Sequence, residues 1–193
     1  MKPVVIIVMD GVGENPSEYG NAVKAAYTPC LDKLKSSCPY TTIKAHGTAV
    51  GLPTDDDMGN SEVGHNALGC GQIYAQGAKL VNESIDSGKM FLSKVWNELI
   101  NQCKTKSSML HFLGLLSDGN VHSNISHLKA MLTELKKEGA GKVRLHVLLD
   151  GRDVPEGSSV KYVKEIEDHM ASLNDSTFDA CIASGGGRMY ITI

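Results

Sequence analysis

The second half of the chain alternates between short apolar runs and longer stretches in which apolar residues recur every three or four positions. The first pattern predicts β-strands and the second predicts amphipathic helices. The predicted elements are a strand at 108–116, a helix at 125–138, a strand at 143–149, a helix at 158–173 and a strand at 178–183. Strands that alternate with helices imply right-handed crossovers, so the pattern predicts an α/β fold with a parallel sheet.

The first half of the chain is less regular. Residues 4–9 form an apolar, mostly β-branched run, which predicts a strand buried on both faces of a parallel sheet, followed by a turn. The other predicted elements are a helix beginning at Thr28-Pro29, a short strand at 40–43, a helix from Ser61 to Gly69, and helices at 78–85 and 91–103. A change of pattern between Gln72 and Lys79 predicts two domains, residues 1–77 and 78–193.

Composition limits the partners and the compartment. The formal net charge of −3 gives no reason to expect nucleic acid or an anionic membrane as partner. Five scattered cysteines without a C-x-x-C pair predict neither a disulfide framework nor a zinc knuckle, and they favour a reducing compartment. No segment has the length of a signal peptide's apolar core or of a membrane span. We therefore expect a cytoplasmic protein.

A polar loop follows each strand predicted in residues 108–183. The loops are 117–123, 150–153 and 184–188. Because the carboxyl ends of parallel strands meet at one edge of a sheet, we expect the loops to line one cleft with His122, Arg152, Asp153 and Arg188. Guanidinium groups bind carboxylate or phosphate in a bidentate fork, and a glycine run lets backbone N–H groups approach an anion. The alternatives are a flexible turn at the glycines, and an Asp153 that pairs with Arg152 or caps a helix.

Residues 55–69 combine acids, glycines, a serine and a histidine with few apolar residues. Ser61 begins the predicted helix, where free N–H groups and the helix dipole favour an anion or an activated hydroxyl. The alternative is that Ser61 only caps the helix. His65 is one turn later, and we expect it to point outward rather than at Ser61, so that a metal activates the hydroxyl. Asp10 follows the first predicted strand, either as a ligand at the sheet edge or as a residue that shapes the turn.

Several motifs carry a resemblance to a known family. D-M-G-N-S-E-V-G-H-N-A-L-G at residues 57–69 resembles the nucleophile segment of the cofactor-independent (2,3-bisphosphoglycerate-independent) phosphoglycerate mutases, members of the alkaline-phosphatase superfamily. The segments G-L-L-S-D-G-N-V-H-S, D-G-R-D and S-G-G-G-R are similar to the substrate-site segments of that family. The resemblance implies part of an alkaline-phosphatase-like metal domain, followed by a second α/β domain that binds substrate.

The resemblance also implies an activity and roles for individual residues. The reaction is the interconversion of 3-phosphoglycerate and 2-phosphoglycerate in glycolysis and gluconeogenesis, through a phosphoserine and without 2,3-bisphosphoglycerate. Two divalent ions, Mn²⁺ or Mg²⁺, serve the complete enzyme, which we expect to be a monomer. By resemblance, Ser61 is the nucleophile, Asp10 and Ser61 bind metal, and the substrate contacts are His122, Arg152, Asp153 and Arg188.

The sequence departs from the family pattern at several points. Asn120 stands where many relatives have glycine, a change that we expect to be tolerated. Members of the family are more than twice as long, and the further arginine that follows Arg188 in them is absent here. We therefore expect a fragment that is inactive alone. Three alternatives remain: a serine hydrolase, although G-x-S-x-x-G does not match the G-x-S-x-G elbow; a non-catalytic α/β module that binds a phospho-anion; and a related phosphomutase such as a phosphopentomutase.

Overall fold

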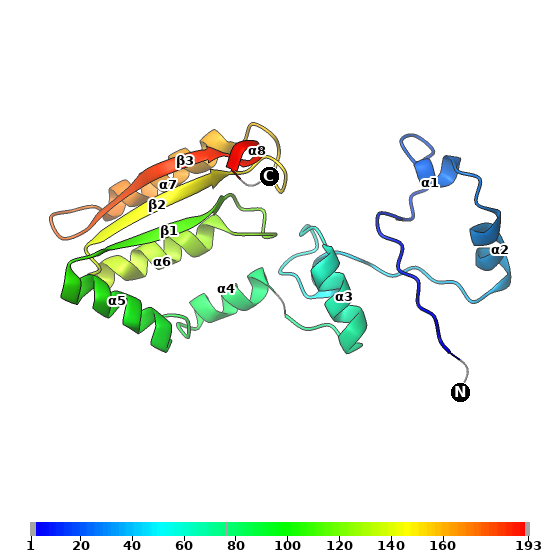
Figure 1. Ribbon diagram of the computed structural model, residues 1–193, viewed down its shortest axis with the longest axis horizontal. Helices are drawn as coiled ribbons and strands as arrows, with labels where there is room; N and C mark the ends of the chain where they lie inside the picture. Colours follow the sequence, from blue (N-terminus) through cyan, green and yellow to red (C-terminus); the bar gives the residue numbers. More distant parts are fainter. Residues whose placement is uncertain (1–2, 76, 192–193) are drawn as a thin grey trace. The chain divides into compact units, whose positions relative to one another are not determined.

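The computed structural model describes residues 3–75 and 77–191, so that residues 1, 2, 76, 192 and 193 lie outside the description. The chain separates into two compact units, Met1–Lys44 and Ala45–Ile193. Figure 1 labels the helices and strands of each. The boundary predicted near residue 77, between domains 1–77 and 78–193, stays a prediction.

The first unit contains two helices, α1 (Ala22–Ala25) and α2 (Pro29–Ser37). The prediction of a helix at Thr28-Pro29 is confirmed, with proline in the first turn, where its missing N–H costs no hydrogen bond. The predicted strands at 4–9 and 40–43 are wrong, because no strand forms among the described residues 3–44. A strand needs a hydrogen-bonded neighbour, and without one the apolar run lies exposed, with Val4 89% accessible.

The second unit begins with short helical elements. They are a 3₁₀ helix η1 (Gly47–Val50), α3 (Ser61–Cys70), α4 (Ala78–Asp86) and α5 (Lys94–Lys106). The predictions of helices from Ser61, from Ala78 and across 91–103 are confirmed. Val50, Leu52 and Val63 form a small apolar core that joins η1 to α3.

The α/β layer contains three strands and two long helices in alternation. The elements are β1 (Met109–Leu116), α6 (Ile125–Lys137), β2 (Lys142–Leu149), α7 (Ser159–Leu173) and β3 (Asp179–Gly187), followed by the short helix α8 (Arg188–Ile191). The sheet order is β1-β2-β3, and both pairings are parallel. The predicted α/β fold with a parallel sheet is confirmed.

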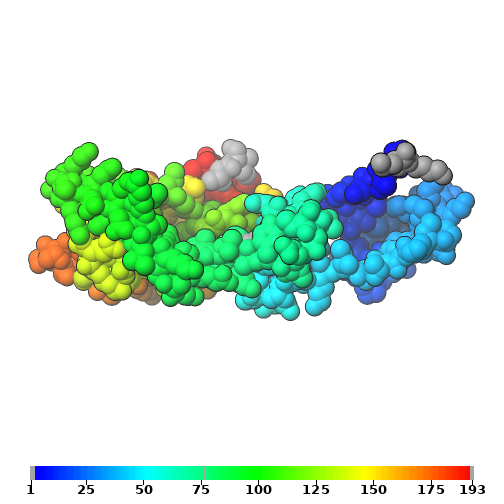
Figure 2. Space-filling model, turned by 90° about the horizontal axis from the view of Figure 1, so that it is seen from below, coloured from blue at the N-terminus to red at the C-terminus, as the bar shows by residue number. Residues whose placement is uncertain are grey.

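The core lies between the sheet and the helices. Val143 and Leu145 of β2 are 0% and 1% exposed, and they belong to one apolar cluster with Leu132 of α6 and Ile166 of α7. The amino ends of the strands meet at one end of the sheet, where the backbone N–H of Asp179 in β3 donates to the carbonyl of Gly141, just before β2, over 2.8 Å. In Figure 2, green, yellow and orange surfaces adjoin there. The polar loops lie at the opposite, carboxyl end.

None of the helices in residues 3–75 and 77–191 combines the length and the apolar character that crossing a membrane requires.

Candidate functional site

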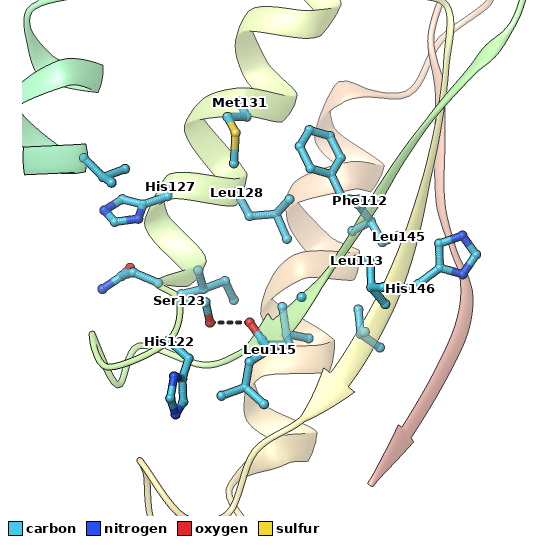
Figure 3. A pocket seen from close by; sticks show the side chains of 16 residues that line it. Phe112, Leu113, Leu115, His122, Ser123, His127, Leu128, Met131, Leu145 and His146 are labelled. Atoms are coloured by element: carbon cyan, nitrogen blue, oxygen red, sulfur yellow. Dashed lines mark hydrogen bonds between the residues drawn. The ribbon is translucent and has the colours of Figure 1, made fainter. Parts of the chain in front are cut away.

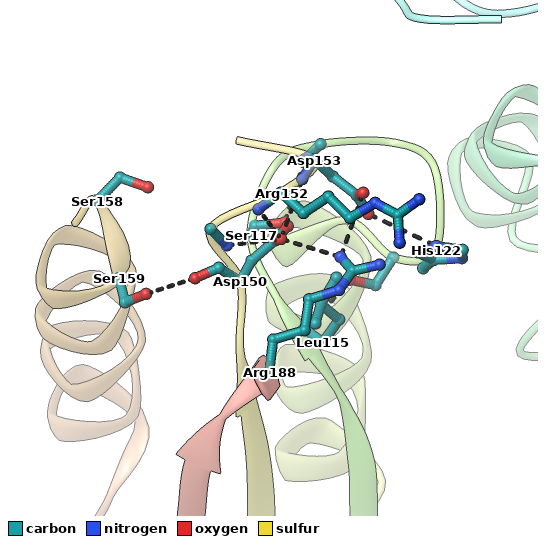
Figure 4. A network of polar contacts seen from close by, with 12 residues as sticks. Leu115, Ser117, His122, Asp150, Arg152, Asp153, Ser158, Ser159 and Arg188 are labelled. Carbon is teal, nitrogen blue, oxygen red and sulfur yellow. Dashed lines mark hydrogen bonds and ion pairs between the residues drawn. The ribbon is translucent and has the colours of Figure 1, made fainter. Parts of the chain in front are cut away.

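One carboxylate connects the carboxyl ends of all three strands. Asp150 follows β2, and its Oδ2 accepts a hydrogen bond of 2.7 Å from the hydroxyl of Ser117, which follows β1. Its Oδ1 accepts one of 3.1 Å from Nη1 of Arg188, which follows β3. Figure 4 shows this network. The predicted convergence of the three loops is therefore confirmed.

Asp150 also folds its own loop. Its Oδ1 accepts hydrogen bonds from the backbone N–H groups of Gly151, Arg152 and Asp153 at 2.7, 3.0 and 3.1 Å. Its side chain is fully buried. Burial alone would raise the pKa of Asp150, but the hydroxyl of Ser117 and the three N–H groups outweigh it and hold the pKa well below its ordinary range. Asp150 is therefore a fixed negative charge at the centre of the loops.

Asp153 lies between a guanidinium and an imidazole. Its Oδ1 is 3.2 Å from Nη1 of Arg188, and its Oδ2 is 3.8 Å from Nε2 of His122. The side chain is 8% exposed, and Oδ2 has no hydrogen-bond donor among the described residues. A Cβ on Gly119 would lie 2.9 Å from that of Asp153, so the absence of a side chain at Gly119 permits the packing. Asp153 therefore has a buried acceptor without a donor beside His122, while its charge is balanced by Arg188.

Arg152 shares the loop with Asp153, and its side chain is exposed. In Figure 4 the guanidinium groups of Arg152 and Arg188 point the same way, toward the side on which His122 lies. The structure thus brings three predicted residues into contact, His122, Asp153 and Arg188, and places Arg152 beside them. Their role in substrate binding stays a prediction.

The glycine run before Arg188 has a different conformation from the predicted one. The loop predicted at 184–188 is wrong over its first four residues, since Gly185, Gly186 and Gly187 pair with β2 as the last residues of β3. Two of these glycines permit close packing: a Cβ on Gly185 would lie 2.8 Å from a methyl group of Val147, and one on Gly186 would lie 2.0 Å from Ile191. The glycines therefore bring Arg188 to the sheet edge, and a contact of their N–H groups with an anion stays a prediction.

Ser61 begins α3, as the sequence predicts. Its neighbour Asn60 caps the helix by accepting a 3.0 Å hydrogen bond from the backbone N–H of Val63, so Ser61 is free of the capping role. The hydroxyl of Ser61 is exposed. This arrangement leaves Oγ beside the N-terminal N–H groups, where the helix dipole favours negative charge.

The expectation that His65 points away from Ser61 is wrong. Nδ1 of His65 is 3.1 Å from Oγ of Ser61 and 2.7 Å from its backbone oxygen, because residues four apart are neighbours on a helix. A carbonyl oxygen only accepts, so the 2.7 Å contact requires a proton on Nδ1. A protonated Nδ1 cannot accept the proton of Ser61. His65 orients the serine, and it is not its base in this geometry.

The predicted metal ligands, Asp10 and Ser61, lie in different units, and the structure does not place the units relative to each other. Oδ1 of Asp10 accepts a hydrogen bond of 2.9 Å from the N–H of Gly11, so Asp10 shapes its turn. Carboxylate and hydroxyl oxygens suit Mn²⁺ or Mg²⁺. Among the described residues, however, no three His, Cys, Asp or Glu side chains gather to hold an ion. These residues alone do not form a metal site, and the assignment stays a prediction.

A cavity of about 250 Å³ lies next to the polar cluster. Its walls come mainly from apolar side chains of β1 and α6, including Phe112, Leu115 and Leu128 (Figure 3). Its polar residues include His122 and His127, and burial lowers the pKa of His127. A small anion requires cations and hydrogen-bond donors rather than an apolar wall. The candidate site is therefore the polar cluster at the sheet edge.

Sequence analysis missed Asp150 and Ser117 as site residues. Both stand directly after an apolar strand, and Asp150 opens D-G-R-D, a pattern in which an aspartate accepts N–H groups of its own turn. That pattern is a usable signal for Asp150. No local signal identifies Ser117, since its partner is 33 residues away.

Comparisons with known proteins show the family to which the chain belongs. A family model described as "BPG-independent PGAM N-terminus" matches residues 81–192. The chain belongs to this family. A probable 2,3-bisphosphoglycerate-independent phosphoglycerate mutase of Leptospira interrogans is 53% identical over 194 residues, and the Zea mays mutase is 51% identical over 195 residues.

The fold also matches a solved mutase. A crystal structure of Leishmania mexicana phosphoglycerate mutase at low cobalt concentration has a TM-score of 0.86 and 47% identity, and the match covers 96% of this chain and 34% of that one. All of this chain aligns with the Leptospira and Zea relatives, but it spans only 35% and 34% of their lengths. The chain therefore corresponds to about a third of a phosphoglycerate mutase of this family.

Proposed function

We propose that this chain carries the phosphoryl acceptor and part of the substrate site of a 2,3-bisphosphoglycerate-independent phosphoglycerate mutase, which interconverts 3-phosphoglycerate and 2-phosphoglycerate in glycolysis and gluconeogenesis. The observation that carries the proposal is the cluster at the sheet edge, in which Asp150 holds the loops of Asp153 and Arg188 together beside His122. Family membership supports the same reading.

The charges of the cluster suit a small anion with a hydroxyl group. Phosphoglycerate carries a carboxylate, a phosphate and one free hydroxyl. Arg152 and Arg188 supply cationic forks for the two anionic groups. Oδ2 of Asp153 is buried and has no donor within the described residues, and it would accept a hydrogen bond from the glycerate hydroxyl once a side-chain rotation exposes it.

Ser61 is proposed as the acceptor of the phosphoryl group. Its oxygen forms a bond to phosphorus as the bond from phosphorus to the substrate oxygen breaks, and the serine proton ends on the released hydroxyl. Glycerate then turns, and its other hydroxyl takes the phosphoryl group as the bond from phosphorus to Ser61 breaks, while the proton of that hydroxyl returns to Ser61. The exposed position at the start of α3 leaves the oxygen accessible, and the N–H groups there stabilise the charge that develops.

A divalent ion, proposed to be Mn²⁺ or Mg²⁺, would lower the pKa of a serine hydroxyl that it binds. Asp10 and Ser61 are the residues of this chain proposed to contribute to its binding, within an alkaline-phosphatase-like domain that includes residues 1–77. Further ligands are required, because the described residues gather no complete set. We therefore expect the 193-residue chain by itself to bind phosphoglycerate weakly and to catalyse no interconversion.

The test is Ser61→Ala in the full-length protein, with Ser172→Ala on the exposed surface of α7 as the matched control. Conversion of 3-phosphoglycerate is followed by ³¹P NMR without added 2,3-bisphosphoglycerate. The proposal predicts that Ser61→Ala abolishes conversion with an unchanged circular dichroism spectrum, and that Ser172→Ala converts at the wild-type rate. Conversion by the Ser61→Ala protein would reject Ser61 as the acceptor.

A further inference from the structure

A hydrogen bond joins the segment that precedes Ser61 to the loop that carries His122. Nδ2 of Asn120 donates to Oδ1 of Asp57 over 2.7 Å, although 63 residues separate the two in the chain. Asp57 lies four residues before Ser61, and Asn120 lies two residues before His122. The contact thus spans the two parts of the proposed site that the sheet itself does not connect.

Asp57 is fixed by its own surroundings. Its Oδ2 accepts hydrogen bonds from the backbone N–H and the hydroxyl of Thr54, at 2.7 and 2.9 Å. Its backbone oxygen accepts from the N–H of Gly47 at 3.0 Å, and the residue is 9% exposed. With Oδ2 occupied and the backbone held, Oδ1 has a defined position from which it accepts the Asn120 amide.

The path from Asp57 to Ser61 is short and closely packed. A Cβ on Gly59 would lie 2.0 Å from the backbone oxygen of Ala45, so Gly59 rests directly against that neighbouring backbone. The next residue, Asn60, caps α3. Val63, in the first turn of α3, packs into the small core with η1. A displacement of Asp57 is therefore transmitted to the start of α3.

Asn120, the donor of this hydrogen bond, is also fixed by its surroundings. Its φ of 58° lies in the left-handed region, which asparagine adopts more readily than other residues with side chains. Its Oδ1 accepts a 2.6 Å hydrogen bond from Nδ2 of Asn124, which caps α6 by accepting from the N–H of Ser126 at 2.8 Å. Its backbone N–H donates to the carbonyl of Ser123 over 3.2 Å, which closes the loop around His122.

We propose that Asp57 and Asn120 are positioning residues, which hold the phosphoryl acceptor Ser61 in register with the His122–Asp153–Arg188 cluster through their side-chain hydrogen bond. The inference rests on the proposed function for its catalytic consequence, but the link itself is independent of it. Neither residue needs to touch the substrate. Loss of the bond frees the start of α3 relative to the cluster, while the contacts within the cluster stay in place.

The chain of donors and acceptors permits a swap that conserves every bond. Asn120→Asp places two carboxylates against each other, and Asp57→Asn places two amides against each other. The double variant restores the bond with its polarity reversed: the new amide at 57 donates to the new carboxylate at 120. The single amide oxygen at 57 still accepts from Thr54, and the second oxygen of the carboxylate at 120 still accepts from Asn124. Asn120→Gly removes the side chain and is free of backbone strain at a φ of 58°.

The first measurement is amide hydrogen exchange of residues 54–63 in the chain as it stands. We expect faster exchange in Asp57→Asn, Asn120→Asp and Asn120→Gly, and exchange restored to the wild-type rate in the double swap. A swap that exchanges like the single variants would overturn the link. So would unchanged exchange in all three single variants.

The second measurement separates kcat from KM in the full-length mutase. We expect kcat to fall about 10–100-fold in the single variants with KM within about twofold, and to recover in the swap, because misplacement of a reacting group slows the chemical step rather than binding. The control is Asn174→Asp, which removes a 2.9 Å hydrogen bond to the carbonyl of Ala180 at the opposite end of the sheet and should leave both constants unchanged.

The outcomes distinguish this inference from the proposed function. Altered exchange with unchanged kcat in the single variants rejects the positioning role. A fall in kcat of equal size in Asn174→Asp rejects it too, since it indicates a general loss of stability. Failure of the proposed function is recognised separately, because Ser61→Ala then retains turnover while the exchange results of the swap are unaffected.

Discussion

Nη1 of Arg188 lies 3.1 Å from the fully buried carboxylate of Asp150, across 38 residues of chain. The same nitrogen is 3.2 Å from Asp153. One guanidinium therefore balances two carboxylates at the edge of the sheet, and it holds the ends of β2 and β3 together. The ion pairs that form the proposed site therefore also stabilise the second unit.

Arg188→Met should destabilise the second unit by about 3–5 kcal/mol, because it leaves two buried carboxylates without their cation. The side chains of Asp150 and Asp153 are 0% and 8% exposed. Arg144→Met is the control, since its partner Asp179 is 54% exposed and such a pair contributes less than about 1 kcal/mol. Urea unfolding followed by the fluorescence of Trp96, the single and buried tryptophan, measures both. Equal losses in the two variants would contradict the account.

Asp150 should make the stability of the second unit sensitive to acid. Burial alone would raise its pKa, but the hydroxyl and N–H groups that donate to it outweigh burial. They hold the pKa in the folded protein below the ordinary value of 3.8. The unfolded chain then binds the proton more readily than the folded one. The contribution of the Asp150 carboxylate to the free energy of unfolding is therefore complete above pH 3.8, and it is lost as the pH falls toward the folded pKa. Asp150→Asn should flatten this part of the profile.

A second acid-sensitive group provides the comparison. The pKa of Asp175 is also lowered, chiefly by the hydroxyl and N–H of Thr177. Asp175→Asn should remove a separate part of the acid dependence, and the double variant with Asp150→Asn should show the flattest profile. Urea midpoints of unfolding at several values between about pH 2 and 6 measure the acid dependence of stability. If stability falls as steeply with acid in Asp150→Asn as in the wild type, Asp150 is not a buried charge that stabilises the fold.

Gly119→Ala should displace Asp153, because the added Cβ would lie 2.9 Å from the Cβ of that residue. We expect a loss of about 1–3 kcal/mol in stability, as for other overpacked sites. Gly114→Ala in β1 is the matched control, since a Cβ there meets nothing within 4 Å, and the change should be neutral or slightly stabilising. Unfolding of the two variants tests the contact, and a similar effect of both would argue against it.

Sequence patterns predicted residues 78–191 well because each element there finds its partner inside the chain. The apolar face of α6 points to a sheet whose three strands follow one another, and Leu132 and Leu135 are 0% exposed as that face requires. The run at residues 4–9 has an equally strong strand pattern. It forms no strand, because strand formation depends on a neighbour that local sequence does not specify.

The site, like the fold, was predictable only in part from the sequence. Topology alone brought His122, Asp153 and Arg188 together, since strand ends of a parallel sheet share an edge. The contacts that order the cluster were not predictable, because they depend on side-chain geometry between distant residues. Asp150 accepting from Ser117 and Asp57 accepting from Asn120 are two such cases. The contact between His65 and Ser61 was missed although it is local, because the rotamer decides it.

The most direct test of the central claim is to identify the residue that carries phosphate during turnover. The full-length protein is mixed with 3-phosphoglycerate and a divalent ion, quenched in acid during turnover, and its peptides are mapped by mass spectrometry. The account predicts phosphoserine at Ser61 in the wild type and none in the Ser61→Ala protein. Interconversion without phosphate at Ser61, or with phosphate on another residue of the chain, would contradict it.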